Sequence, residues 1–291
     1  GLVGSEMCIR DRSTVDGDLT LTSGNASGIT DSGTVTVGGN FSATTDANNG
    51  VINVGTMAVD GTFTLAPNGT GAVTIVNDAG LNLAASTMGG TFTGTATTGN
   101  ITDSGALAIT GTTTLVTSAD DATITLDTAT NAFTGAMTIT TNDASGTDAD
   151  VTIDGGTTAL NIGASTIDGD LTVTSGNASG IIDSGNVTVG GNLIATTDAN
   201  NGVIDLGTTT VTGTMDLTSH GSGNVTIDNA NADIVLIASE IGGNLTLTTG
   251  NASGIIDSGN VTVGGNLVAT TDDNNGVIDL GTTTVTGTMD L

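Results

Sequence analysis

The feature that most constrains this chain is a short unit that recurs along it. Each unit reads apolar-x-Gly-x-apolar and continues with alternating residues, as in Val189-Gly190-Gly191-Asn192-Leu193. Its period is mostly about 22 residues, which is too short to bury a face alone, so the unit must stack on its neighbours. The first positions of the unit are Val15, Val37, Val59, Ile167, Val189, Val211, Ile241, Val263 and Val285, with looser steps at Met88, Ile109 and Phe133.

The short units are grouped into a longer repeat. The segment STVDGDL at residues 13–19 returns as STIDGDL at residues 165–171, with related forms at Ser86 and Ser239. Four long repeats are therefore expected, at 13–85, 86–164, 165–238 and 239–291. Each join between them is longer than one short unit, as in the step from Val59 to Met88. The sequence leaves open whether these longer steps hold an extra half-coil or a protruding loop.

The residues inside each unit favour β-structure. Alternation such as Val187-Thr188-Val189 points apolar residues to one side and threonine to the other. Glycine and asparagine between these runs suit turns with positive φ. We predict an all-β chain, a β-solenoid with coils of about 22 residues, and roughly twelve to fourteen coils spaced ~4.8 Å apart.

The charged residues are distributed unevenly. The only cysteine (Cys8) and the only two basic residues (Arg10 and Arg12) lie in the first twelve positions, while the net charge is −28. A chain without further basic residues is a poor partner for nucleic acid or anionic lipid. No apolar run in the sequence approaches the length that a membrane-spanning helix needs. We expect no nucleic-acid partner, no membrane insertion and no disulfide.

Residues 1–12 differ from the rest in more than charge. The segment GLVGSEMCIRD resembles the conceptual translation of a transposase-based sequencing adapter. This resemblance implies that residues 1–12 are an artefact and that 13–291 is one repeat array, a fragment of a longer chain. The fold is therefore read from 13–291.

Catalytic residues are not expected. Carboxylates recur with the repeat, as in TTDANNG at residues 44–50 and again at 196–202, whereas a catalytic site is a unique constellation. A carbohydrate-active enzyme with paired carboxylates ranks low for this reason. The single histidine, His220, is expected to be a solvated loop residue.

No metal or cofactor site is predicted either. Calcium is the strongest alternative, because the turns carry hard oxygen ligands at Asp198, Asn200, Asp272, Asp273 and Asn274. The nonapeptide of calcium-binding β-rolls is absent, so solvated turns are preferred. The glycine pairs at 38–39, 190–191 and 264–265 have no following lysine and are expected to be corner residues rather than phosphate-binding loops.

Threonine runs such as 208–210 and 282–284 suggest one non-enzymatic alternative. Stacked threonines would form a flat lattice of hydroxyl and methyl groups, as in some ice-binding solenoids. An unbroken threonine column over at least five coils would favour an ice- or surface-binding module. Threonine also suits exposed strands generally.

The segments GNITDSGALAITGTTTL (99–115) and ATITLDTATNAFTGAMTI (122–139) resemble the β-strand repeats of filamentous-haemagglutinin-like bacterial exoproteins. The resemblance covers 13–291 and implies a right-handed parallel β-helix in a large secreted or surface-anchored adhesin. It implies a structural or adhesive stalk outside the cell, acting in adhesion, biofilm matrix or filaments. Its partners would be cell-surface or matrix polysaccharide or protein, or other copies joined end to end.

Overall fold

The computed structural model describes residues 2–3, 12–46, 48–144, 148–198, 200–230, 232–250, 254–271 and 275–291. It divides into two compact units, Gly1–Asn142 and Asp143–Leu291, which are described separately. Within the described ranges every regular element is a strand and none is a helix. Parallel strands stack in about 12 coils roughly 22 residues apart, which confirms the predicted β-solenoid.

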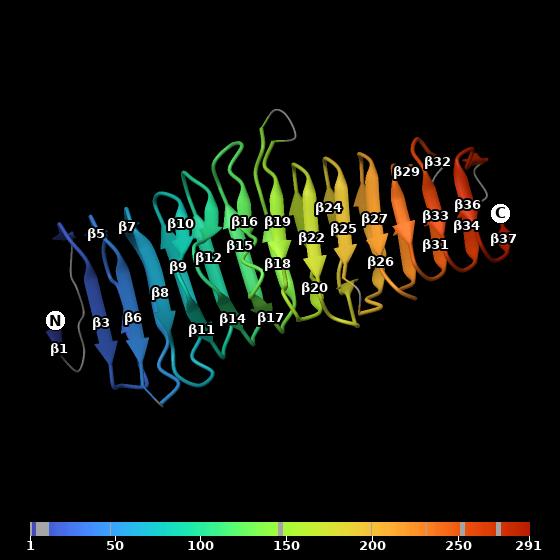
Figure 1. Cartoon of the computed structure of the whole chain (residues 1–291). Coiled ribbons are helices and arrows are strands. Elements are labelled where there is room, and N and C mark those ends of the chain that lie inside the picture. Colours follow the sequence, from blue (N-terminus) through green and yellow to red (C-terminus); the bar gives the residue numbers. More distant parts are fainter. Residues whose placement is uncertain are drawn as a thin grey trace. The chain divides into compact units, whose positions relative to one another are not determined.

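The first unit runs from blue to green in Figure 1, with its strands stacked in parallel. Its strands are β1 (Leu2–Val3), β2 (Ser13–Val15), β3 (Leu19–Ser23), β4 (Ile29–Thr30), β5 (Val35–Val37), β6 (Phe41–Thr45), β7 (Ile52–Val59), β8 (Thr62–Ala66), β9 (Val73–Asn77), β10 (Leu81–Leu83), β11 (Ser86–Met88), β12 (Phe92–Ala96), β13 (Ile101–Asp103), β14 (Leu107–Ile109), β15 (Thr113–Thr117), β16 (Ile124–Leu126), β17 (Ala132–Phe133) and β18 (Met137–Thr140).

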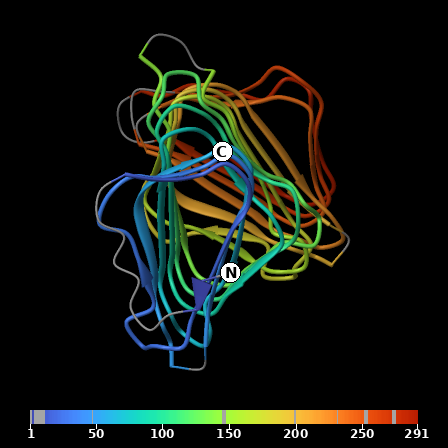
Figure 2. The same cartoon turned by 90° about the vertical axis from the view of Figure 1, so that its left-hand side faces the viewer.

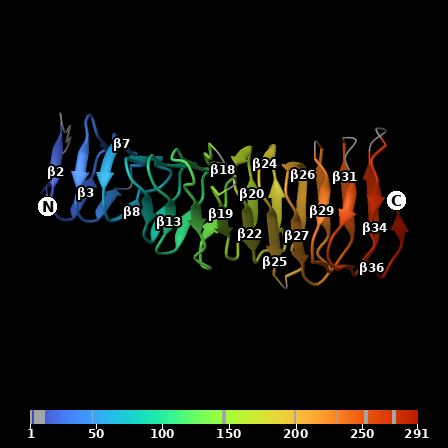
Figure 3. The same ribbon diagram turned by 90° about the horizontal axis from the view of Figure 1, so that it is seen from above.

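The second unit runs from yellow-green to red, and its parallel strands are also seen in Figure 3. They are β19 (Val151–Asp154), β20 (Leu160–Ile162), β21 (Ser165–Ile167), β22 (Leu171–Ser175), β23 (Ile181–Asp183), β24 (Val187–Val189), β25 (Leu193–Thr197), β26 (Ile204–Val211), β27 (Met215–Ser219), β28 (Val225–Asn229), β29 (Ile234–Leu236), β30 (Ser239–Ile241), β31 (Leu245–Thr249), β32 (Ile255–Asp257), β33 (Val261–Val263), β34 (Leu267–Thr271), β35 (Ile278–Asp279), β36 (Thr283–Val285) and β37 (Met289–Asp290).

Each coil has two kinds of side. The straight side is one five-residue strand, such as β3 or β6. The bent side is a pair of short strands, such as β4 and β5, or one eight-residue strand, such as β7. Figure 2 views the coils of the first unit from their N-terminal end. Turns between the sides carry the glycine and asparagine residues that were expected at corners.

The strand registers confirm the regular step between coils. In the first unit Val15 pairs with Val37 and Val37 with Val59. Identical positions of successive coils therefore lie directly above one another. In the second unit the same positions pair in parallel at Ile167, Val189 and Val211, and again at Ile241, Val263 and Val285.

The core of each unit is a set of stacked apolar columns. Inward positions such as Val37, Ile75 and Leu83 in the first unit are at most 1% exposed, whereas the preceding residues, Thr36, Thr74 and Asn82, are half-buried. All four phenylalanines lie buried in the first unit, and the rings of Phe41 and Phe63 meet edge to face with centroids 5.8 Å apart. Full burial of one such side chain contributes about 1.5–3 kcal/mol.

The longer step of the repeat holds an extra half-coil. In the first unit the straight-side strand β8 is followed directly by a second straight-side strand, β9. β9 pairs with the bent-side strand β7, and the next bent-side strand, β10, pairs with β8. Straight and bent sides therefore change places, and we call residues 62–88 the side exchange of the first unit.

The second unit contains the same arrangement. β27 and β28 are consecutive straight-side strands, β28 pairs with the bent-side strand β26, and β27 pairs with the bent-side strands β29 and β30. Residues 215–241 form this side exchange. For the join within the first unit and the join within the second unit, the alternative left open by the sequence is thus decided in favour of a half-coil.

A buried asparagine fills the mismatch that the exchange creates. The ladder between β7 and β9 shifts register between Val54 and Met57, which leaves Val59 without a backbone partner on β9. The fully buried side chain of Asn77 replaces that partner: Oδ1 accepts from Val59 N at 2.9 Å, and Nδ2 donates to Val59 O at 3.1 Å and Gly80 O at 2.6 Å. An amide side chain here imitates a peptide group.

Asn229 makes the equivalent contacts in the second unit. Its Oδ1 accepts from Val211 N at 2.7 Å, and its Nδ2 donates to Val211 O at 3.1 Å and Asp233 O at 2.7 Å. The side chain is 0% exposed. Both exchanges therefore depend on one satisfied polar residue inside the core.

Little of the N-terminal leader is described. Leu2 and Val3 form β1, which pairs in parallel with β3. Cys8 and Arg10 lie outside the described residues, and Arg12 is exposed. The origin of residues 1–12 from an adapter stays a prediction.

Candidate functional site

The aspartates of the recurring DSG sequence bind the next coil. In the first unit Asp31 Oδ1 accepts from Gly55 N at 3.0 Å, and its Oδ2 accepts from Thr56 N at 2.7 Å and Thr56 Oγ1 at 2.8 Å. These donors lie at the bend of β7, where the ladder is interrupted. The carboxylate therefore satisfies the donors at the bend of β7, which is a structural role.

The same task recurs at the other DSG sites. Asp183 accepts from Gly207 N at 3.1 Å and Thr208 N at 2.7 Å, and Asp257 accepts from Thr282 N at 2.9 Å. In the first unit Asp103 accepts from Asn131 Nδ2 at 2.7 Å. A carboxylate held by several N–H and O–H donors is poorly placed to act as a base or nucleophile.

A second polar column runs along the corner before each straight side. In the second unit Asp170 Oδ1 accepts from Asn192 N at 2.6 Å, and Asn192 Oδ1 accepts from Thr214 N at 2.8 Å. In the first unit Asp18 and Asn40 accept in the same way from the following coil. Each side-chain oxygen thus binds the backbone N–H of the equivalent corner one coil later.

The glycine pairs are corner residues, as predicted. A Cβ added at Gly39 would lie 2.3 Å from Asp18 Oδ1 and 2.8 Å from the backbone carbon of Gly17. A Cβ at Gly190 would lie 2.5 Å from Asp168 O. Successive coils approach too closely at this corner for any side chain, so the glycines are needed for stacking.

The turns proposed as calcium ligands are internally bonded. Asp198 accepts from Asn200 N at 3.0 Å, and from Asn200 Nδ2 at 2.8 Å and 3.1 Å. Asp46 and Asn48 repeat this arrangement in the first unit. The absence of a cation from these turns stays a prediction. The further candidates Asp272, Asp273 and Asn274 lie outside the described residues.

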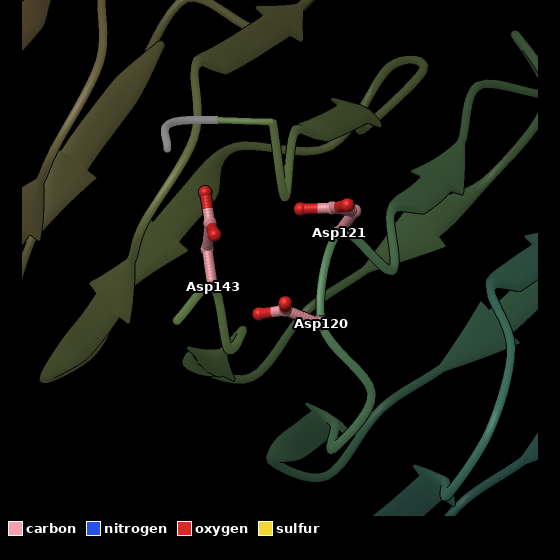
Figure 4. A group of neighbouring side chains, drawn as sticks. All are labelled: Asp120, Asp121 and Asp143. Atoms are coloured by element: carbon pink, nitrogen blue, oxygen red, sulfur yellow. The ribbon is translucent and has the colours of Figure 1, made fainter. Parts of the chain in front are cut away.

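Three other aspartates are drawn in Figure 4. Asp120 and Asp121 are exposed residues in the turn between β15 and β16 of the first unit, and Asp121 has a φ of 59°. Asp143 is the first residue of the second unit and is half-buried. Acidic side chains are frequent on so acidic a chain, and we assign no metal to them.

His220 lies in the turn after β27 and is exposed. Its Nδ1 lies within hydrogen-bonding distance of the carbonyl oxygen of Thr197. The residue is therefore a turn residue, in agreement with the expectation from the sequence.

Threonine columns are shorter than the ice-binding hypothesis requires. One column of the first unit runs over four coils, through Thr74, Thr93, Thr114 and Thr138, and meets Asn53 on one side. In the second unit Thr174, Thr196 and Thr218 are followed by Glu240. Neither column reaches the five coils set as the criterion.

A shallow groove accompanies the side exchange of the first unit. It encloses about 350 Å³ and is lined by Asp60, Thr62, Asn82, Asn100 and Thr102 among others. Among the described lining residues Asp60 is the only one with a titratable side chain, so the groove lacks a pair of such groups for acid–base chemistry.

Asn77 and Asn229, the residues with the most specific surroundings, were not predicted from the sequence. A signal was present: in VTIVN and VTIDN the asparagine continues the inward alternation of the preceding valine and isoleucine. Asparagine was read as a turn residue throughout, and this alternation was overlooked.

Comparison with known proteins identifies a repeat and no activity. Residues 70–140 and 148–206 are similar to the family described as "Repeats of unknown function (DUF5649)". No curated protein and no solved structure matches the chain. Among the described residues, none forms a helix of the length and apolarity that crossing a membrane requires.

Proposed function

We propose that this chain is a structural segment, a stiff spacer or stalk that is not an enzyme. The observation that supports the proposal is that its polar side chains are used for stacking one coil on the next. Asp31, Asp183, Asn192 and Asn229 all accept from backbone N–H groups of neighbouring coils. Such contacts add length and stiffness to the array, and they engage the repeated carboxylates and amides in structural hydrogen bonds.

The proposal extends to the setting of the protein. The likeness of residues 99–115 and 122–139 to filamentous-haemagglutinin-like repeats supports a large bacterial exoprotein at the cell surface. A net charge of −28 keeps such a surface soluble and free of nucleic acid. Partners would be polysaccharide or protein of the cell surface or matrix.

The test is whether the function of the array depends on the distance that it spans between an anchor and a binding module. Residues 13–291 are placed between a cell-surface anchor and a nanobody, and capture of beads bearing the antigen is measured through a polymer brush and without one. The matched variant lacks residues 165–238, a deletion that restores the Ala–Ser junction of the repeat. It removes roughly 17 Å at ~4.8 Å per coil.

The spacer hypothesis expects the shortened array to capture fewer beads through the brush and equal numbers without it. Display of both arrays is checked with a terminal epitope tag. Equal capture through the brush would contradict the proposal, as would release of reducing ends from a panel of polysaccharides by the purified chain.

A further inference from the structure

The groove at the first side exchange is lined by polar side chains that the stacking of coils does not use. It encloses about 350 Å³, within the range of about 300–1,000 Å³ that small-molecule sites occupy. Asp60, Asn82 and Thr102 line it, and their side chains make no hydrogen bond with any described residue. They differ in this from carboxylates such as Asp31, which bind the next coil.

The groove residues follow one another across successive coils. Asn82 on β10 pairs with Thr62 on β8 and with Thr102 on β13. Neighbouring strands lie ~4.8 Å apart, so hydroxyl, amide and hydroxyl groups succeed one another at that step. Asp60 precedes Thr62 by two residues and adds a carboxylate to the same lining. One ligand can therefore contact several of these groups at once.

Asn82 is not explained by packing. Its Oδ1 is buried and has no hydrogen-bond partner among the described residues. A buried polar atom without a partner lowers stability, and an apolar residue at this position would avoid that penalty. Because the terminal amide torsion is soft and no bond holds it, a rotation about χ2 brings Oδ1 to the groove. An amide here is better explained by a ligand in the groove.

The second side exchange shows that the fold does not need these polar groups. β29 pairs with β32 there in the way that β10 pairs with β13 in the first unit. The residues equivalent to Asp60, Asn82 and Thr102 are less polar and uncharged: they are Thr212, Val235 and Ile256. The same coil geometry thus forms without the carboxylate, the amide and the hydroxyl of Thr102.

An amide without a partner does not by itself make a groove of this kind. Asn161 of the second unit also has a buried Oδ1 without a partner among the described residues. It pairs with Ile182 of the next coil, whereas Asn82 pairs with Thr102. The next coil therefore gives Asn161 an apolar neighbour where it gives Asn82 a hydroxyl group, which makes Asn161 a matched control.

The lining fits a ligand that both donates and accepts hydrogen bonds at closely spaced atoms. The carboxylate of Asp60 only accepts, whereas the amide of Asn82 and the hydroxyl of Thr102 do both. The hydroxyl groups of a sugar match all three. Asp60 and the net charge of −28 disfavour an anionic sugar. A cationic peptide would leave the donors of Asn82 and Thr102 unused.

We propose that the groove lined by Asp60, Asn82 and Thr102 binds a neutral saccharide. Asp60 accepts hydrogen bonds from sugar hydroxyls, and Asn82 and Thr102 exchange hydrogen bonds with neighbouring hydroxyls. No aromatic ring is among the described lining residues, so binding depends on these bonds and is expected to be weak. In naming the partner class the proposal rests on the proposed function, but the groove binds whether or not the array acts as a spacer.

The test uses NMR of the isotope-labelled full chain with three neutral probes, maltotetraose, cellotetraose and N-acetylchitotetraose. The side-chain amide resonance of Asn82, assigned with Asn82→Val, is expected to move in a saturable way with at least one of them. The resonance of Asn161 is expected to stay in place. Oligogalacturonate and tetralysine, the anionic and cationic probes, are expected to leave Asn82 unmoved.

Two variants carry the residues of the second side exchange into the groove and are therefore expected to fold. Asn82→Val and Thr102→Ile should each weaken binding of the active probe at least fivefold, measured by the backbone amide resonances around the groove. Asn161→Val makes the same change outside the groove and should leave the affinity unchanged. Thermal unfolding of all three variants checks that the fold is kept.

The outcome is separable from that of the spacer test. A chain lacking residues 165–238 is shorter but keeps residues 60–102, so it should bind the saccharide as the parent chain does. Absence of a saturable shift at Asn82 with all three neutral probes would overturn the proposal. Equal binding by Asn82→Val would also overturn it, as would a shift that only tetralysine produces.

Discussion

Two buried polar side chains of the first unit, Asn77 and Thr113, lie in the same sheet but differ in their hydrogen bonding. Asn77 sits at the side exchange and has all of its donor and acceptor groups engaged. Thr113 lies in a regular part of the ladder, where it pairs with Phe92 of one neighbouring coil and Met137 of the other. Its Oγ1 has no hydrogen-bond partner among the described residues. The regular coil favours apolar residues inside, whereas the exchange needs an amide.

The largest expected effect comes from removing the amide. Asn77→Leu leaves Val59 N, Val59 O and Gly80 O without the side chain that binds them. We expect the free energy of unfolding to fall by about 3–5 kcal/mol, because each buried unsatisfied group costs about 1–3 kcal/mol. The measurement is urea unfolding followed by circular dichroism.

The control for this variant is Asn68→Ala, which alters an exposed turn asparagine. It is expected to change stability by less than about 0.5 kcal/mol. A loss at Asn77→Leu as small as that of the control would show that the exchange does not depend on the amide.

A change of opposite sign in the free energy of unfolding is expected at Thr113, in the regular part of the ladder. Thr113→Val removes a buried hydroxyl that has no partner among the described residues and keeps the shape of the side chain. Stability should rise by about 1–2 kcal/mol, since burying an unpaired hydroxyl costs about that much. The same urea titration measures it, with Thr114→Val, on the outward side of β15, as the control. Destabilisation by Thr113→Val would mean that the hydroxyl contributes to the fold.

The smallest expected effect is a difference between two carboxylates of the second unit in how they make the stability of the fold depend on pH. Burial raises the pKa of Asp257, but hydrogen bonds from Thr283 and Thr282 outweigh it and hold the pKa below its ordinary value. Burial raises the pKa of Asp216. Asp257 therefore stabilises the fold above the unfolded pKa and loses this effect as the pH falls through its folded pKa. Asp216 stabilises below the unfolded pKa and loses its effect as the pH rises.

Stability is measured from acid to neutral pH for Asp257→Asn and Asp216→Asn. Asp257→Asn should destabilise at neutral pH and approach the parent chain in acid. Asp216→Asn should stabilise slightly at neutral pH and lose this gain in acid. If stability depended on pH in the same way for both variants, the pKa shifts of opposite direction at Asp257 and Asp216 would be contradicted.

Much of the coil was predictable from the sequence because its apolar positions repeat at a regular step. Val15, Val37 and Val59 were expected to stack and do so. The exchange was not predictable, because a half-coil and a protruding loop use the same turn residues. Deciding between them required seeing that β9 pairs with the bent strand β7. Asn77 was missed because asparagine was interpreted as a turn residue. Its inward position is visible in VTIVN, but its partner Val59 follows from a register shift that only the structure shows.

The structural role of the repeated carboxylates was predictable in kind, but their partners were not. The recurrence of carboxylates with the repeat, as in TTDANNG, indicated architecture, and the contacts of Asp31 and Asp198 are of that kind. The direction of those contacts was not predictable, because nothing in the sequence marks Gly55 and Thr56 as the partners of Asp31. Such pairings follow from the bend of β7, which only the structure shows.

The side exchange gives an array of these repeats a parity. Each exchange turns the straight side to the opposite wall of the coil, so an odd number of exchanges leaves every later surface facing the other way. A second exchange restores the original facing. Lengthening such an array by one exchange therefore places the straight side of each later coil on the opposite wall, and lengthening it by two returns that side to its first wall.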